Sequence, residues 1–123
     1  MEKVLEIDFI SKIAEKFRRS PFQRNKIHQT DAEIIMLNDE LGKYLAVTTD
    51  TISEEIKFGL YDDPFLIGWM TVMVNMSDLA AVGAAPIGIL ISESFTNGMD
   101  QEYISKIQKG IEAACRKCNT FVL

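Results

Sequence analysis

The sequence predicts an α+β domain in which a mixed β-sheet is covered on one face by helices. Apolar residues recur at helical spacing in three segments, and β-branched or aromatic residues concentrate in the segments between them. The chain has 123 residues, of which 47% are hydrophobic, and this is enough for one domain with a core of its own. We therefore expect residues 1–123 to form a single domain.

The first predicted element is an amphipathic helix that begins after Asp8, a residue type that favours the N-cap position. Its apolar positions are Phe9, Ile10, Ile13, Ala14 and Phe17. After a polar loop, residues 32–37 and 43–52 have the composition of two β-strands. The short connection at residues 38–42 is typical of a hairpin.

A long apolar helix is predicted over residues 64–83, with Asp63 as its N-cap and Pro64 at the first helical position. Gly83 suits the position just after its end. Residues 86–95 alternate isoleucines with smaller side chains and predict a strand. A second helix is predicted over residues 100–117, and a further strand is predicted to begin at residue 121.

Three polar residues interrupt the long helix within one turn: Asn75, Ser77 and Asp78. An ionised carboxylate in an apolar helix is costly unless a cation or several hydrogen-bond donors meet it. Two interpretations follow from the spacing alone. The helix has one solvated polar stripe, or Asp78 is a metal-binding carboxylate held by a rigid, buried helix.

Composition excludes several classes of protein. The formal net charge of −5 and a pI near 4.8 argue against a nucleic-acid partner, which requires a basic face. The charged N-terminus has no signal-peptide pattern, and Asp78 near the centre of the longest apolar run argues against a membrane span. We therefore expect a cytoplasmic protein. The sequence contains no Walker A loop, and its single histidine, His28, has no nucleophile elbow near it.

Cys115 and Cys118 form a C-x-x-C pair late in the last predicted helix. A zinc site needs further ligands that lie nearby, and a redox pair is favoured at a helix N-terminus. Neither condition is met by the sequence, so we expect buried or half-buried thiols here.

Three motifs resemble the AIR synthase-related ATP-binding superfamily. They are T-T-D-T at residues 48–51, D-P-F-L-I-G-W at residues 63–69, and N-M-S-D-L-A-A-V-G-A-A-P at residues 75–86. Their order and spacing also agree with that family. Among its branches, the chain most resembles thiamine-monophosphate kinase.

This resemblance implies an ATP-dependent kinase that uses Mg²⁺ and ATP and acts on a small-molecule acceptor. The metal ligands that it implies are Asp31, Thr48, Thr49, Asp50 and Asp78. Asn75 is expected to contact the nucleotide. Lys57 stands where the family has a substrate-facing histidine, so it is either a substrate-binding cation or a solvated lysine. From pattern alone, Asp50 at a strand end is more typical of a turn or cap.

One departure concerns the family's G-D-D motif, which is replaced by Gln29-Thr30-Asp31. The glycine and the first carboxylate are lost, so the number of metal ions held and the acceptor substrate stay open. No catalytic residue is assigned.

In the family, the sequence continues beyond the region of Leu123 into another metal-binding motif and a C-terminal domain. The chain is therefore expected to be the N-terminal part of a longer protein and to be inactive alone. The family also pairs such sheets into a homodimer. Two alternatives stay open: another enzyme of the superfamily, either a cofactor-salvage nucleoside kinase or an aminoimidazole ribonucleotide synthetase-like protein, and a non-catalytic nucleotide-binding module.

Overall fold

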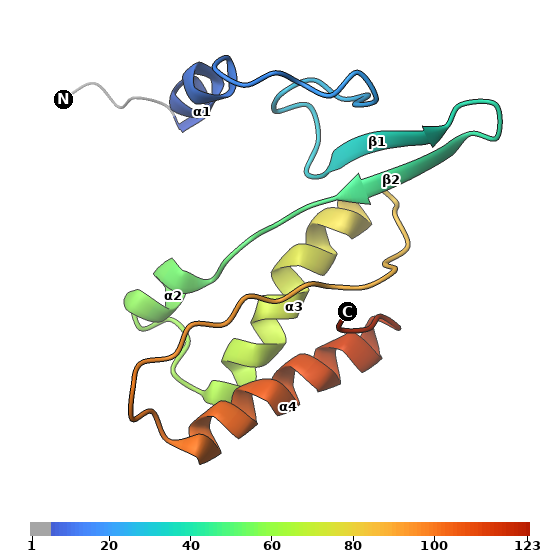
Figure 1. The fold of residues 1–123 in the computed structure, drawn as a ribbon. Helices are drawn as coiled ribbons and strands as arrows, with labels where there is room; N and C mark the ends of the chain where they lie inside the picture. The colour runs from blue at the N-terminus through green and yellow to red at the C-terminus, as the bar shows by residue number, and fades with distance from the viewer. Residues whose placement is uncertain (1–5) are drawn as a thin grey trace. The chain divides into compact units, whose positions relative to one another are not determined.

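The structure is a computed structural model that describes residues 6–123. The chain forms two compact units that meet in sequence between Thr48 and Thr49 (Figure 1). The first unit contains helix α1 (Glu6–Ala14) and strands β1 (Glu33–Asn38) and β2 (Lys43–Val47). The second contains helices α2 (Ser53–Lys57), α3 (Pro64–Ala81) and α4 (Gln101–Lys117).

Helix α1 is formed by the predicted segment, but its bounds differ from the prediction. The helix already includes Glu6, so Asp8 lies inside it and the prediction that Asp8 is the N-cap is wrong. The reason is that Ile7 extends the apolar repeat, and acidic side chains in a first turn are favourable toward the helix dipole. Helix α1 ends at Ala14, so Phe17 lies beyond it and is 69% exposed.

Strands β1 and β2 form the predicted hairpin. They pair in antiparallel fashion, with Ile35 opposite Leu45. In the connection, the Asn38 side chain accepts a hydrogen bond from the Leu41 backbone N–H at 3.0 Å. Gly42 has a φ of 58°, a left-handed conformation that glycine adopts without steric cost. Strand β2 ends at Val47, so the predicted strand over residues 43–52 is too long.

The predicted mixed sheet is not formed within residues 6–123. The sheet described there is two-stranded and antiparallel, and the segment at residues 86–95 is extended without being a strand. Among the residues that the structure describes, parallel pairing is limited to one bridge between Ile89 and Val122. There the Ile89 N–H donates to the Phe121 carbonyl at 2.8 Å, and the Leu123 N–H donates to the Ile89 carbonyl at 3.0 Å. Pro86 has no N–H to donate, and Gly88 weakens a strand, so this segment pairs at one point only.

Helix α3 has the N-terminus that was predicted from the sequence. A carboxylate oxygen of Asp63 accepts a hydrogen bond from the Leu66 backbone N–H at 2.7 Å, and Pro64 occupies the first helical position. At the other end Gly83 has a φ of 70°, and Ala84 donates to the Leu79 carbonyl at 2.9 Å. This pairing satisfies the last carbonyls of the helix in a Schellman motif.

Helices α3 and α4 approach each other at two glycines. A Cβ atom at Gly68 would lie 1.9 Å from the Ile107 carbonyl oxygen, and one at Gly110 would lie 2.0 Å from the Phe65 carbonyl oxygen. Each glycine therefore lets the backbone of the partner helix come close. Asp100 caps α4 by accepting a hydrogen bond from the Glu102 N–H at 3.1 Å. The helix therefore begins where the sequence predicted.

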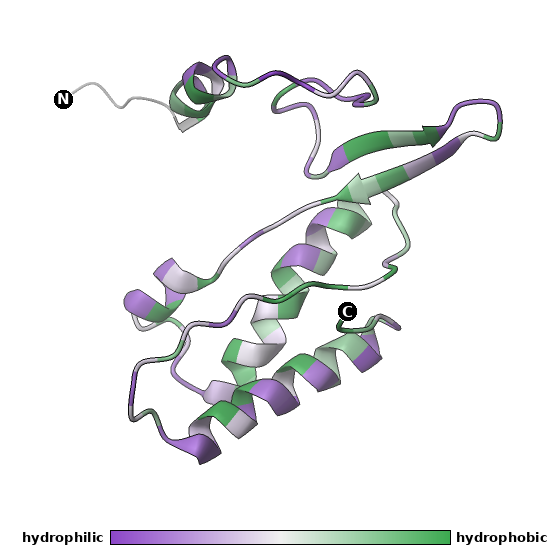
Figure 2. Cartoon of the chain, in the orientation of Figure 1, coloured by the Kyte–Doolittle hydropathy of each residue, from purple (hydrophilic) through white to green (hydrophobic). Residues whose placement is uncertain are grey.

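The core of the second unit lies between α3 and α4 and extends to neighbouring extended segments. Figure 2 shows hydrophobic colour over most of α3, with hydrophilic colour toward its C-terminal half. The buried members are Ile52, Ile67, Val72, Met76, Ile89, Ile107, Ile111, Ala114 and Cys115. None of the helices in residues 6–123 combines the length and the apolar character needed to cross a membrane.

Candidate functional site

The polar cluster predicted on the long helix lies on α3, away from its buried face. The buried residues of α3 are Ile67, Gly68, Val72 and Met76. Asn75 and Asp78 are half-buried, and Ser77 is exposed. Because Asn75 and Asp78 are three residues apart in a helix, their side chains are neighbours on one face. Asp78 is therefore half-buried, which lies between the solvated stripe and the buried carboxylate that the two interpretations of the sequence predicted.

A side chain of α3 contacts the T-T-D-T segment directly. The Asn75 amide donates to the backbone carbonyl of Asp50 at 3.4 Å and also to the carbonyl of Thr71 at 3.0 Å. Asp50 and Asn75 are 25 residues apart in the sequence. The backbone of Asp50 thus lies beside Asn75, and both predicted carboxylates, Asp50 and Asp78, belong to the second unit.

The carboxylate of Asp50 also stabilises its own turn. One of its oxygens accepts a hydrogen bond from the Thr51 backbone N–H at 2.7 Å. This is the turn role that the local pattern predicts. An ionised carboxylate has about four lone-pair sites, so this bond leaves acceptor capacity for a cation. The side chain is exposed, as is that of Thr49 before it.

The other predicted ligands, Asp31 and Thr48, lie in the first unit. The Thr48 hydroxyl donates to the Asp31 backbone carbonyl at 3.4 Å, so these two residues are neighbours. Asp31 is exposed and Thr48 is half-buried. Lys57, the predicted substrate contact, is the last residue of α2 and is exposed.

The predicted ligands supply carboxylate, hydroxyl and carbonyl oxygens, which are the hard donors that Mg²⁺ prefers. Within residues 6–123, no three His, Cys, Asp or Glu side chains are close enough together to hold a metal ion. The structure therefore shows no complete metal site in this part of the chain, and the ligand roles of Asp50 and Asp78 remain a prediction.

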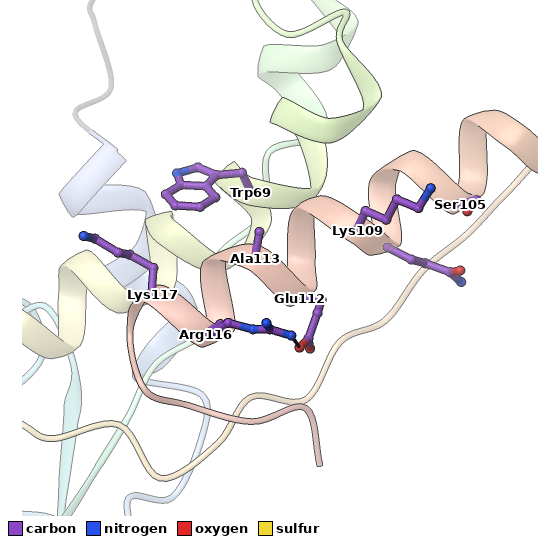
Figure 3. Close-up of a pocket in the computed structure, with 8 residues that line it drawn as sticks. Trp69, Ser105, Lys109, Glu112, Ala113, Arg116 and Lys117 are labelled. Carbon is purple, nitrogen blue, oxygen red and sulfur yellow. Dashed lines mark hydrogen bonds and ion pairs between the residues drawn. The ribbon is translucent and has the colours of Figure 1, made fainter.

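A groove that the sequence analysis did not predict is lined by Trp69 of α3 and by one side of α4 (Figure 3). It has a volume of about 700 Å³ and is open to solvent. Arg116 in its wall is paired with Glu112 at 2.9 Å. Its α4 residues repeat at helical spacing, which is the sequence signal for this stripe: Ser105, Gln108, Lys109, Glu112, Ala113, Arg116 and Lys117. The groove contains none of the predicted site residues.

The two cysteines are reduced and lie at the C-terminal end of α4. Cys115 is 2% exposed and Cys118 is half-buried, so the prediction of buried or half-buried thiols is confirmed. Burial raises the pKa of the Cys115 thiol, and the nearby Glu112 and Cys118 raise that pKa further. Its thiol proton is therefore held more tightly than in an exposed cysteine, unlike that of an activated nucleophile.

Comparison with known protein families shows which family this chain belongs to. A family model described as AIR synthase related protein, N-terminal domain, matches residues 29–123. The chain belongs to this family. The AIR synthase related match includes β1, β2, α3 and α4 and every predicted site residue.

Curated relatives of this AIR synthase related domain include three thiamine-monophosphate kinases. That of Aquifex aeolicus is 33% identical over 63% of this chain and 26% of its own length. That of Synechococcus elongatus is 29% identical over 72% of this chain and 28% of its own length. That of Methanospirillum hungatei is 36% identical over 58% of this chain and 24% of its own length. The chain thus spans about a quarter of the length of these relatives. No solved structure matches it.

Proposed function

We propose that this chain is the N-terminal, Mg–ATP-binding and dimerising domain of an ATP-dependent small-molecule kinase that is similar to thiamine-monophosphate kinase. The observation that carries the proposal is the hydrogen bond from Asn75 to the Asp50 carbonyl. It joins the end of the T-T-D-T segment to the helix that carries Asp78. The similarity of this domain to several thiamine-monophosphate kinases supports the same activity class.

In this proposal Asp50 and Asp78 provide carboxylates to Mg²⁺, and Thr49 adds a hydroxyl or carbonyl oxygen. When bound, the metal neutralises charge on the triphosphate and orients it for transfer to an acceptor. Asn75 positions Asp50 and contacts the nucleotide. Asp31 and Thr48 are proposed, from the family resemblance alone, as further oxygen ligands, and Lys57 as a cation for the acceptor.

Asp78→Asn in the complete protein that contains this domain tests the metal role. We expect Mg²⁺-dependent ATP binding, measured by calorimetry, to fall at least tenfold, since an amide is a poor ligand for Mg²⁺ and leaves the triphosphate charge less neutralised. The melting temperature without ligand should stay close to that of the parent, because Asp78 is half-buried and the amide keeps its shape.

Ser77→Ala is the matched control, since Ser77 is the exposed neighbour of Asp78 on the same helix. It should keep both ATP affinity and stability. An Asp78→Asn protein that melts lower but retains its ATP-induced stabilisation would contradict the metal role and assign Asp78 a structural one.

One specific feature favours a second candidate function, a non-catalytic nucleotide-binding module. Gln29-Thr30-Asp31 lacks the first carboxylate of the family motif, which removes one metal ligand. The complete protein should be tested with Mg–ATP and a panel of alcohol and phosphate acceptors. Turnover supports the kinase, whereas binding without turnover supports the module. The 123-residue chain alone should not turn over in either case.

A further inference from the structure

The sulfur atoms of two helices meet at the C-terminal end of α4. The Cys118 thiol donates toward the Met73 thioether of α3, with 3.7 Å between the sulfur atoms. Cys115 lies three residues before Cys118 and is therefore on the same side of α4. The proposed kinase site uses none of these residues, and 45 residues separate Met73 from Cys118 in the chain.

We propose that Cys115, Cys118 and Met73 form a binding site for a soft monovalent cation, with Cu(I) as the ion it fits. Thiolate and thioether sulfurs are the ligands that select Cu(I) over harder ions. The site joins the end of α4 to the middle of α3. It is independent of the Mg–ATP site, whose ligands are oxygens.

The distance supports this assignment. Two sulfur atoms that bind one metal ion at about 2.3 Å lie roughly 3.8 to 4.0 Å apart in tetrahedral or trigonal geometry. The Cys118–Met73 separation of 3.7 Å is close to this range, so only a small movement is needed to bind one ion. In a helix, residues three apart have Cβ atoms about 5–6 Å apart, so a rotation of the Cys115 side chain brings the third sulfur within reach.

The surroundings of the sulfurs decide which ion fits. Structural zinc sites use four ligands of the cysteine, histidine or carboxylate kind. This place offers only two ligands of that kind, the two thiols, because no three His, Cys, Asp or Glu side chains lie close together among residues 6–123. Cys115 is 2% exposed, and Val72 and Ala114 of the same core have no exposed surface. Cys118 and Met73 are half-buried, so an ion can enter from their side.

Binding is a proton-for-metal exchange without electron transfer. The S–H bonds of Cys115 and Cys118 break, their two protons pass to solvent, and two copper–sulfur bonds form. Met73 donates a sulfur lone pair and releases no proton. Because two protons are released when the ion binds, affinity should rise with pH.

The test is a titration of the reduced 123-residue chain with Cu(I) under anaerobic conditions, in competition with a chromogenic Cu(I) chelator. We expect one copper per chain, release of two protons, and three copper–sulfur contacts by X-ray absorption. Met73→Leu should weaken binding at least tenfold relative to the parent. Cys118→Ser should weaken it more strongly, by a hundredfold or more. Both substitutions are close in volume to the native residue.

Met70→Leu is the control, because Met70 lies on the same helix and packs against the same core without a sulfur contact among the described residues. It should bind copper as the parent does, and circular dichroism of the metal-free variants should show that all are folded. The proposal is overturned if Met73→Leu binds as tightly as the parent. It is equally overturned if one copper bridges two chains, or if Zn²⁺ is retained more strongly than Cu(I).

Discussion

At the scale of single residues, two non-glycine residues within 6–123 adopt left-handed backbone conformations, and one of them directly follows a helix. Asn119 has a φ of 51° and follows the α4 C-cap, Cys118. The Thr120 N–H donates to the Cys115 carbonyl at 2.9 Å across this turn. Asparagine tolerates this conformation better than other residues that carry a Cβ atom, which accounts for its place here.

Asn119 therefore allows a test with two substitutions. Asn119→Ala should lower the free energy of unfolding by about 1 kcal/mol, because alanine adopts a positive φ less readily than asparagine does. Asn119→Gly should keep the parent stability or exceed it, since glycine adopts a positive φ freely. Urea unfolding measures both, and equal losses in the two variants would show that the Asn119 side chain, not its backbone, stabilises the end of α4.

At the scale of elements, the caps of α3 and α4 are local features with local energies. Asp63 satisfies the Leu66 N–H at 2.7 Å, whereas its neighbour Asp62 is exposed and makes no such bond among the described residues. The two carboxylates are therefore matched in charge and position, and they differ in one hydrogen bond.

Asp63→Ala should cost about 1 kcal/mol of stability, the usual loss on removing an N-cap side chain. Asp62→Ala is its control and should change stability by a few tenths of that amount. Thermal unfolding followed by circular dichroism measures the difference. Losses of the same size in both variants would mean that overall charge, rather than the cap, accounts for the effect.

The crossing of α3 and α4 depends on two glycines that each contact backbone atoms of the other helix. Gly68→Ala and Gly110→Ala should each destabilise the second unit by about 3 kcal/mol, because a Cβ atom would lie 1.9 or 2.0 Å from a carbonyl oxygen. This sign is opposite to intrinsic helix propensity, which favours alanine by about 1 kcal/mol.

Chemical denaturation with Gln108→Ala as control measures this effect, since Gln108 lies on the exposed side of α4. The control should match or slightly exceed the parent. A stabilised Gly68→Ala protein would show that the helices separate at little cost and that close approach does not hold the core together.

At the scale of the whole molecule, large apolar side chains remain exposed on the extended segments of the second unit. Ile87 is 73% exposed, Leu90 80%, Phe121 66% and Leu123 73%. Ile89 and Val122 form the bridge between these segments. Contiguous apolar surface of this kind is typical of a protein–protein contact.

We predict that the chain self-associates through its β-segments, as the family resemblance implies. Sedimentation velocity at concentrations on the order of tens of micromolar should give a dimer. Leu90→Lys should shift the distribution toward monomer, because it places a charge in the contact, whereas Lys43→Arg on the hairpin should not. A parent chain that is monomeric in this range would contradict the prediction.

Local chemistry made much of this fold predictable. Asp63, Pro64 and Gly83 delimit α3, Asp100 begins α4, and Gly42 ends the hairpin turn. Each of these features depends on residues within a few positions of one another. The segment at residues 86–95 was wrongly predicted as a strand, because strand formation depends on partners elsewhere in the chain, and here the partner is a single bridge to Val122.

The candidate site shows the same division. Its residue types and motifs were readable from the sequence and pointed to the family that the comparison confirms. The contacts were not: Asn75 meets Asp50 across 25 residues, and Cys118 meets Met73 across 45. The sequence by itself determined the family and the caps of α3 and α4, and it predicted a set of oxygen ligands. Only the tertiary structure decided which side chains are neighbours and how deeply Asp78 is buried, because these depend on how α3 packs against distant segments.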